Sequence, residues 1–274
     1  MKIRNLDSTA FHFVDHLSAA RMGVAAARQL PLHFGVADLP QGLDALVLAA
    51  DLQGRVGERL LGEALADELA RLAGCGILPQ MDRTGVILAG DLYSAPGADV
   101  RGASGDVRPV WRAFVRGHRW AAGVAGNHDT FSDEDGFDHG RSFREAHLLD
   151  GRCRDLDGLL VGGVGGIIGD SRKPARRSER EFLRSLRKVL SARPDIVVLH
   201  QGPDAERGEL RGHAAVRQAL DRSGELLVVC GHVYWPRPLV EIRGGAQVLN
   251  VDGRVVILTR PDFRPRQPAA PDPA

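Results

Sequence analysis

The stretch AGVAGNHD at residues 122–129 decides the fold class, because a short apolar run ends there in a Gly-Asn-His-Asp loop. Four other apolar runs end in the same manner, each followed at once by a polar loop: LVLAADLQG (46–54), VILAGD (86–91), IVVLHQGP (196–203) and LVVCGHVY (227–234). The first strongly polar residue of every loop is Asp, Asn or His. Open α/β sheets gather their ligands in the loops at the carboxyl ends of strands. We therefore expect the five loops to meet in one site.

Apolar runs of this length, bounded by glycine and polar residues, indicate buried strands rather than helices. They occupy residues 43–50, 85–89, 120–125, 159–164, 195–199 and 225–230. Amphipathic stretches that suit helices lie at residues 57–73, 178–191 and 214–221. Strands that alternate with helices predict an α/β fold whose sheets are covered by helices. Near the end, Asp252-Gly253 separates the β-prone runs 246–250 and 255–259, which predicts a hairpin.

The two ends of the chain give less signal. Residues 1–40 are expected to form an N-terminal extension that is partly helical, with a short helix over Ser18–Leu30 ended by Pro31. Residues 261–274 are rich in proline and lack periodicity, so we expect a disordered tail. The main domain is therefore predicted to span residues 41–260.

Composition narrows the partners and the compartment. A formal net charge of +1 gives no bulk attraction for nucleic acid, and an aromatic content of 5% offers no stacking platform for single strands. No stretch approaches the roughly 20 apolar residues that cross a bilayer, and the N-terminus does not have the pattern of a secretory signal. The three cysteines are too widely spaced for a disulfide framework or a zinc ribbon. We therefore expect a cytoplasmic protein with no membrane or nucleic-acid partner.

The five loops together indicate a metal site. A single Gly-Asp after a strand is usually a turn or a helix cap, and a single histidine there is usually structural. Five such loops in succession, each after an apolar run, are not explained by turns alone. Their side chains offer oxygen and imidazole donors without a thiolate, a set that suits Mn²⁺, Fe or Zn²⁺ better than Ca²⁺.

In this order the motifs resemble the calcineurin-like metallophosphoesterase superfamily, whose pattern is Asp-x-His, Gly-Asp, Gly-Asn-His-Asp/Glu, a lone His and Gly-His-x-His. The resemblance extends from Leu43 to Thr259. It implies two packed mixed β-sheets flanked by helices in a four-layer sandwich. It also implies one or two divalent metal ions per chain, with Mn²⁺ preferred and Fe or Zn²⁺ as alternatives.

Carried over to this sequence, the resemblance makes Asp91 a bridge between two metals, with one of the two sites completed by the side chains of Asn127, His200 and His232. It makes His128 the group that assists the leaving group, oriented by Asp129. The implied reaction is attack of a metal-activated hydroxide on the phosphorus of a phosphate monoester or diester. The implied substrate is a phosphorylated small molecule or a nucleotide.

The other metal site departs from the family pattern. Asp-x-His reads Asp51-Leu52-Gln53 here, and Gly-His-x-His ends in Tyr234. Gln53 is a candidate ligand through its carbonyl oxygen, which favours Mn²⁺ over Zn²⁺. Alternatively, Tyr234 binds a ferric ion as a phenolate. A third hypothesis leaves this site empty and makes the protein a weak or inactive relative that acts as a binding scaffold. The retained polar set favours hydrolysis, because buried polar groups without a function cost stability.

Two charged stretches lie outside the five motifs. Residues 172–180 include five basic side chains and predict either a solvated loop or a lid over a phosphorylated substrate. Residues 132–140 are acidic, and Asp133, Asp135 and His139 are further candidates for a vacant metal position.

Overall fold

A computed structural model describes residues 1–20, 23–131, 145–205 and 210–265. Its larger sheet has ten strands: β1 (Ile3–Leu6), β2 (His12–Ala19), β3 (Ala25–Ala37), β4 (Ala45–Ala49), β5 (Arg55–Val56), β6 (Arg59–Leu60), β7 (Thr84–Leu88), β9 (Trp120–Gly123), β11 (Ala146–Leu148) and β20 (Val255–Thr259). The order across this sheet is β11-β9-β7-β4-β20-β3-β2-β5-β6, and β1 pairs with β3. The sheet is mixed, because β4, β7, β9 and β11 are parallel while β20 is antiparallel to β4.

The second sheet has six strands: β12 (Arg152–Leu156), β13 (Leu159–Val164), β16 (Ile196–Gln201), β17 (Leu227–Gly231), β18 (Leu239–Glu241) and β19 (Gln247–Asn250). Their order is β12-β13-β16-β17-β19-β18, with parallel pairing from β13 to β19 and antiparallel pairing at both edges. Two small parallel pairs complete the strands: β8 (Gly105–Asp106) with β10 (Asp129–Thr130), and β14 (Ile167–Ile168) with β15 (Arg176–Arg177).

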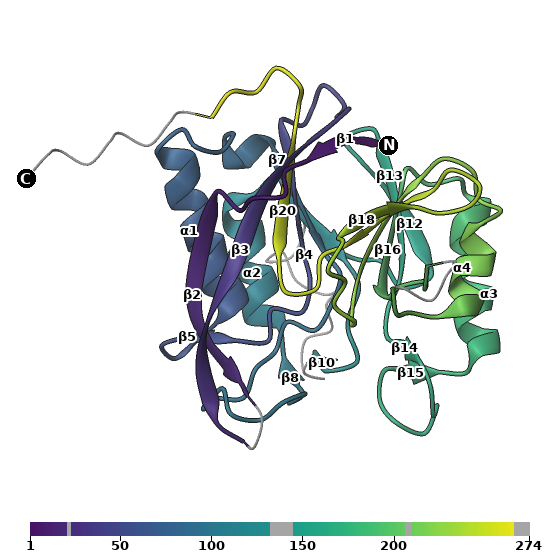
Figure 1. Ribbon diagram of the computed structural model, residues 1–274, viewed down its shortest axis with the longest axis horizontal. Coiled ribbons are helices and arrows are strands. Elements are labelled where there is room, and N and C mark those ends of the chain that lie inside the picture. Colours follow the sequence, from purple (N-terminus) through teal and green to yellow (C-terminus); the bar gives the residue numbers. More distant parts are fainter. Residues whose placement is uncertain (21–22, 132–144, 206–209, 266–274) are drawn as a thin grey trace, which may run out of the picture.

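The helices of the described residues cover the outer faces of the two sheets. They are α1 (Leu61–Gly74), α2 (Arg108–Gly117), α3 (Glu179–Ser191), α4 (Ala214–Leu220) and the 3₁₀ turn η1 (Met81–Arg83). Helices α1 and α2 pack on the ten-stranded sheet, and α3 and α4 pack on the six-stranded sheet (Figure 1). The two sheets face each other across a core of their own. The predicted α/β sandwich of two packed mixed sheets flanked by helices is confirmed.

Burial on both faces explains why the central strands read as unbroken apolar runs. Along β4, the side chains of Ala45, Val47 and Ala49 point to the helix layer, and those of Leu46 and Leu48 point to the other sheet. Strands β7 and β20 divide their side chains between the same two cores, and β16 divides its side chains between the inter-sheet core and the layer of α3 and α4. The six predicted strands and three predicted helices are all present, with ends shifted by a few residues. Helix α2 was not predicted.

The helix predicted over Ser18–Leu30 is wrong. Strand β2 ends at Ala19, and β3 begins at Ala25 and pairs with both β2 and β20. The alanines of this stretch favour a helix locally. Pairing of β3 with a strand on each side, and burial of Leu30 in the core beneath α1 and α2, favour the strand instead. The first forty residues are thus built into the larger sheet.

The hairpin predicted at the C-terminal end is also wrong. Strand β19 pairs in parallel with β17 in the six-stranded sheet, whereas β20 pairs with β4 in the ten-stranded sheet. The two runs pack beneath different helices: Val248 of β19 lies under α3 and α4, and Ile257 of β20 lies under α1 and α2. The Asp252-Gly253 turn therefore connects the two sheets, with Gly253 at φ 65°.

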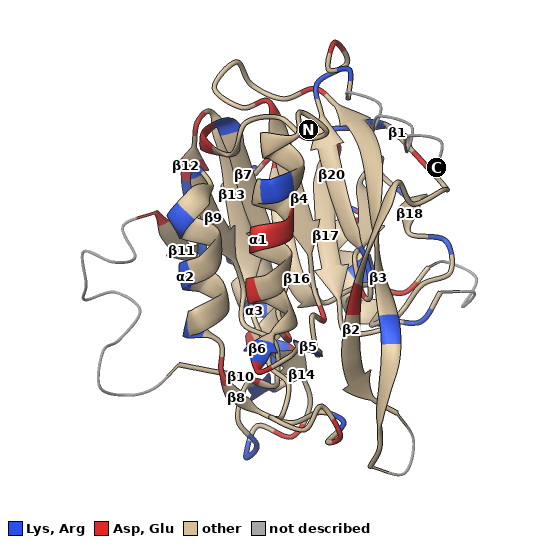
Figure 2. Ribbon diagram, turned by 90° about the vertical axis from the view of Figure 1, so that its left-hand side faces the viewer, with Lys and Arg blue, Asp and Glu red and all other residues tan. Residues whose placement is uncertain are grey.

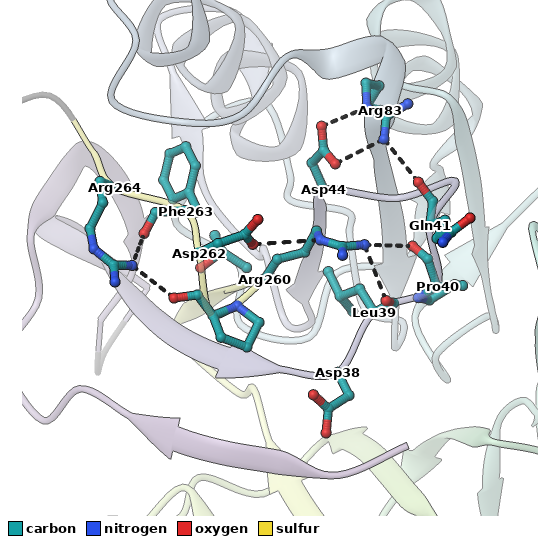
Figure 3. Close-up of polar contacts among 12 residues, drawn as sticks. Asp38, Leu39, Pro40, Gln41, Asp44, Arg83, Arg260, Asp262, Phe263 and Arg264 are labelled. Carbon is teal, nitrogen blue, oxygen red and sulfur yellow. Dashed lines mark hydrogen bonds and ion pairs between the residues drawn. The ribbon is translucent and has the colours of Figure 1, made fainter.

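The segment after β20 is held against the loop between β3 and β4 (Figure 3). Arg260 donates hydrogen bonds of 3.4 Å to the carbonyl oxygens of Leu39 and Pro40. Next to it, Arg83 forms a two-pronged ion pair with Asp44 at 2.5 and 3.0 Å. The predicted disordered tail lies mostly outside the described residues, which end at 265.

The charged side chains are distributed over the helices, turns and loops, while the strands carry few of them (Figure 2). The basic stretch 172–180 includes β15, where Arg177 forms an ion pair with Asp150. Asp133, Asp135 and His139 lie outside the described residues. In the described parts of the chain, no helix is both long and apolar enough to span a membrane.

Candidate metal centre

The five predicted loops meet at one edge of the sandwich. They follow β4, β7 and β9 of the larger sheet and include the ends of β16 and β17 of the smaller one, near β10 in Figure 1. At three of these strand ends the backbone is left-handed: φ is 53° at Asp51, 56° at Asp91 and 69° at His232. A non-glycine residue in this region costs about 1–3 kcal/mol, and such residues cluster at functional sites. The side chains at these three positions all line one cavity.

Three of the predicted metal ligands are close enough to share one ion. Donor atoms of Asp91, His200 and His232 all lie within 4.8 Å of one another. The imidazole of His200 is fully buried, and its Nδ1 lies 2.8 Å from the carbonyl oxygen of Ala89. With Nδ1 donating to that carbonyl, Nε2 is left to face Asp91. A backbone partner of this kind fixes the ring orientation and tautomer of a metal-binding histidine.

Two buried polar atoms at this point have no hydrogen-bond partner among the described residues. They are Asn127 Oδ1 and His200 Nε2. His200 Nε2 lies 3.3 Å from Asp91 Oδ2, so the protonated imidazole forms an ion pair with this carboxylate. Buried polar atoms are nearly always satisfied in proteins, so the Asn127 oxygen, which has no partner among the described residues, needs an explanation. A divalent cation would satisfy it, and an amide oxygen, an imidazole nitrogen and a carboxylate are a suitable donor set for such an ion.

The residues of the altered second site are also at this edge. Gln53 Nε2 donates a hydrogen bond of 3.2 Å to Asp91 Oδ2, and Asp51 Oδ2 accepts one of 2.9 Å from the backbone N–H of His232. Rotation of the Gln53 amide by half a turn brings its carbonyl oxygen to the position facing Asp91. Gln53 is thus placed to contribute an oxygen ligand next to the carboxylates of Asp51 and Asp91.

Asp252 is a member of this cluster that the sequence did not reveal. It follows β19 and lines the same cavity as Asp51 and Asp91. Burial and the nearby charge of Asp252 raise the pKa of Asp51 well above its usual range. In the sequence, Asp252 precedes a glycine between two β-prone runs, which is typical of a turn. Its position became apparent only from the crossing between sheets.

Tyr234 does not fit the role of a metal ligand. Its side chain is 59% exposed, and the guanidinium of Arg254 lies over its ring at 4.7 Å from the centroid. It does not line the cavity that contains the other candidates. The alternative in which Tyr234 replaces the missing histidine as a phenolate is therefore excluded by this geometry.

His128 lies beside the donor cluster and lines the cavity. Its backbone N–H donates to Asp91 Oδ1 at 2.9 Å, which ties the His128 loop to the central carboxylate. Its Nδ1 lies 3.2 Å from Ser104 Oγ. Gly102 packs against the same ring: a Cβ at this position would lie 3.0 Å from His128 Cε1. Ser104 and Gly102 precede β8, in a region to which the sequence analysis gave no role.

The carboxylate of Asp129, which was predicted to orient His128, is hydrogen-bonded to backbone groups. It accepts three backbone N–H hydrogen bonds, from Asp91 and Gly126 at 2.8 Å and from Leu92 at 2.7 Å. It therefore holds two of the strand-end loops together. The group that contacts the His128 imidazole is Ser104, not Asp129.

The charges of the cluster shift the pKa values of its two histidines in opposite directions. Burial alone lowers the pKa of His200, but the carboxylates of Asp91 and Asp51 outweigh it and raise the pKa to about 10. Burial and the neighbouring His200 lower the pKa of His232 to about 4. At neutral pH, the carboxylates therefore favour the protonated form of His200, and His232 is neutral and available as a ligand.

The donor cluster opens into a cavity of about 680 Å³. Asp51, Gln53, Asp91 and His232 all line this space, so neighbouring side chains do not seal them off. The volume is within the range of about 300–1,000 Å³ that is usual for small-molecule sites. A small ligand can therefore reach the metal-binding side chains.

Comparison with known protein families agrees with this geometry. Residues 46–236 match the family described as calcineurin-like phosphoesterase. Comparison with curated proteins finds no match. Among solved structures, a phosphopantetheinyl hydrolase from Mycobacterium tuberculosis is similar, with 13% sequence identity and a TM-score of 0.47 over 77% of this chain and 90% of the hydrolase. A hypothetical protein from Thermus thermophilus has 16% identity and a TM-score of 0.44 over 75% of each chain.

Proposed function

Because the chain belongs to the calcineurin-like phosphoesterase family, we propose that it is a metal-dependent hydrolase of phosphate monoesters or diesters. One observation carries the proposal: Asp91, His200 and His232 converge within 4.8 Å beside an unpartnered Asn127 oxygen, at the end of an open cavity. A binding scaffold has no need for this donor set at the bottom of an accessible space.

The residues fit one well-formed metal position and a second one richer in oxygen. Asn127, His200 and His232 would hold the first ion together with Asp91, and Asp51 and Gln53 would hold the second with the same bridging carboxylate. When bound, such ions neutralise charge on the phosphoryl oxygens and lower the pKa of water. The amide and carboxylate oxygens of the second position favour Mn²⁺ over Zn²⁺.

The protein's own side chains do the remaining work. The Ser104 contact and the close approach of Gly102 fix the His128 ring at the cavity wall. From there His128 donates a hydrogen bond or a proton to the departing ester oxygen. Asp129 keeps the Asp91 and Gly126–His128 loops in register, so that the phosphoryl group and His128 meet in a fixed geometry.

The test is turnover of an aryl phosphate monoester and an aryl phosphate diester with added Mn²⁺. We expect His128→Ala to lower turnover by at least about 100-fold, because acid catalysis contributes that much. Asp91→Asn should lower it at least as much, because it removes the carboxylate charge that both metal positions would share. Tyr234→Phe is the matched control, since this exposed side chain lies outside the cavity, and it should retain full activity. Circular dichroism confirms that each variant is folded.

Metal analysis completes the experiment. Removal of metal with EDTA should abolish turnover, and Mn²⁺ should restore it more fully than Zn²⁺. Activity that survives both His128→Ala and Asp91→Asn would overturn the proposal. Absence of turnover in the Mn²⁺-loaded wild type would overturn it as well and favour the scaffold hypothesis.

The compartment and the substrate belong to the same proposal. Cys75, Cys153 and Cys230 are free thiols, as expected for a protein of the reducing cytoplasm. The cavity supports a phosphorylated small molecule or a nucleotide as substrate, since its volume exceeds the needs of a phosphate alone.

A further inference from the structure

The hairpin of β2 and β3 forms part of the cavity wall, although it precedes the segment that matches the family. Opposite residues of an antiparallel pair project to the same face. Val14 pairs with Leu30 and His16 pairs with Arg28. Val14 and Leu30 belong to the core beneath α1, and Leu30 also reaches the cavity, which His16 and Arg28 line. One face of the hairpin therefore changes from apolar to polar where it leaves the core, and Arg28 adds a positive charge to the cavity wall.

The hairpin is fixed to the metal loops. Gly54, three residues after Asp51, leaves room for the His16 ring: a Cβ there would lie 2.5 Å from His16 Cδ2. Leu17 pairs with Arg55, and the Arg55 guanidinium donates to the carbonyl oxygens of Ser94 and Ala95. Arg28 is thus held at a defined place relative to the loops that carry Asp51 and Asp91.

A second arginine lines the same cavity from another direction. Arg101 directly precedes Gly102, the residue that packs against the His128 ring, and it is exposed within the cavity lining. Within the described parts of the chain, neither Arg28 nor Arg101 has a carboxylate partner. Other arginines near acidic groups in this protein are paired, for example Arg108 with Asp106 and Arg217 with Asp204.

The cavity is therefore lined by groups of both charges. Its carboxylates come from the strand-end loops and from Asp252, and its guanidinium groups come from the hairpin and the loop before β8. Bound metal ions would neutralise the carboxylates and leave the arginines as the positive charge of the cavity. A substrate that carried only the scissile phosphate would leave Arg28 and Arg101 without a role.

We propose that Arg28 and Arg101 bind a second phosphate group of the substrate, so that the protein acts on phosphorylated molecules with two separate phosphate groups. This inference rests on the proposed function, because the metal end of the cavity must take the first phosphate. The planar guanidinium group binds phosphate through two parallel hydrogen bonds, which suits it to this role. The second phosphate then contributes binding energy remote from the reacting bond.

Binding of two matched ligands tests the proposal. Hexylphosphonate and hexane-1,6-bisphosphonate contain no ester bond for the protein to hydrolyse, share a flexible chain and differ in the second phosphoryl group. Their affinities are measured by calorimetry on the Mn²⁺-loaded protein for the wild type, Arg28→Gln, Arg101→Gln and Arg187→Gln. Arg187 is exposed on α3 and does not line the cavity, so it is the matched control.

We expect the wild type to bind the bisphosphonate at least about tenfold more tightly than hexylphosphonate, as the loss of a charge-assisted hydrogen bond is of that size. Arg28→Gln and Arg101→Gln should each reduce bisphosphonate affinity about tenfold and leave the affinity for hexylphosphonate unchanged. Equal affinities of the two ligands in the wild type, or equal losses for both ligands in the variants, would refute the second phosphate site.

Aryl phosphate turnover of the wild-type protein separates this inference from the proposed function. A wild type that discriminates between the ligands but hydrolyses no ester would contradict the proposed function alone. A wild type that hydrolyses aryl phosphate without discriminating between the ligands would contradict the second phosphate site alone.

Discussion

Replacement of Asp129 by alanine separates a structural role from a catalytic one. The carboxylate accepts hydrogen bonds from the backbone N–H groups of Asp91, Leu92 and Gly126, and it is 8% exposed. Each buried N–H group left without an acceptor costs about 1–3 kcal/mol. Three such groups predict that Asp129→Ala lowers the free energy of unfolding by at least about 3 kcal/mol. This is a large part of the roughly 5–15 kcal/mol that is typical of a whole protein.

The assay is urea unfolding of the metal-free protein at about pH 8, where a group with a pKa near 6 is ionised. Burial and the charge of Asp91 raise the pKa of Asp129 to about 6, so its carboxylate is ionised under these conditions. Ser104→Ala is the matched control, because it removes the contact to the His128 ring from an exposed residue. We expect Ser104→Ala to change stability by less than about 0.5 kcal/mol and to lower turnover.

Two results would contradict the roles assigned to Asp129 and Ser104. If Asp129→Ala unfolds at the same urea concentration as the wild type and loses only turnover, Asp129 acts on His128 as the family resemblance implied. If Ser104→Ala retains full turnover, the contact between Ser104 and His128 has no part in catalysis.

Three further predictions concern protons and packing. Burial lowers the pKa of His118 to about 4, below its value in the unfolded chain. As the pH falls, the unfolded chain therefore binds a proton first, and the free energy of unfolding should decrease by about 3 kcal/mol between pH 6.5 and pH 4. His118→Gln should remove this decrease in urea unfolding measured over that pH range, and an unchanged pH dependence in the variant would contradict the prediction. Because the pKa of His200 is about 10 in the metal-free protein, Mn²⁺ should release about one proton at neutral pH and bind more tightly as the pH rises. Calorimetry in two buffers of different ionisation enthalpy measures that proton, and equal heats would exclude it. Gly85→Ala should destabilise the protein by about 1–3 kcal/mol, since the added Cβ would lie 2.4 Å from Trp120 Cζ2. Thermal unfolding measures this loss. Gly74→Ala on α1 is the control, because its added Cβ would meet nothing within 4 Å and should have little effect on the melting temperature.

The layers, and the convergence of Asp91, His200 and His232, could be predicted from the sequence, because both depend on local pattern. A strand such as β4 that is buried on both faces must be apolar throughout, and this gives an unbroken run. Parallel strands bring their carboxyl ends to one edge, so residues such as Asp91 and His200 could be placed together without knowledge of the strand order.

The pairing of strands, and contacts between residues far apart in the sequence, could not be predicted from the local apolar pattern. The apolar pattern of β19 and β20 shows that each strand is buried, but not that they belong to different sheets. The same limit hid Asp252, whose role depends on the crossing between sheets, and Arg28, whose role depends on pairing between β3 and β2. The N-terminal stretch was misjudged because its alanine-rich composition favours a helix until β20 supplies a strand partner.

The residues that could be predicted from local pattern differ in proposed function from those that could not. The motif residues come from strand ends and make the chemistry, so they follow a pattern that the fold itself repeats. Arg28 and Arg101 come from a hairpin and a loop whose positions depend on distant pairing, and they line the same cavity as the strand-end motifs. Loops and appended elements on a rigid scaffold vary more freely than the scaffold does. Reaction type is therefore encoded where the sequence is most predictable, and substrate choice where only the assembled fold shows which side chains face the site.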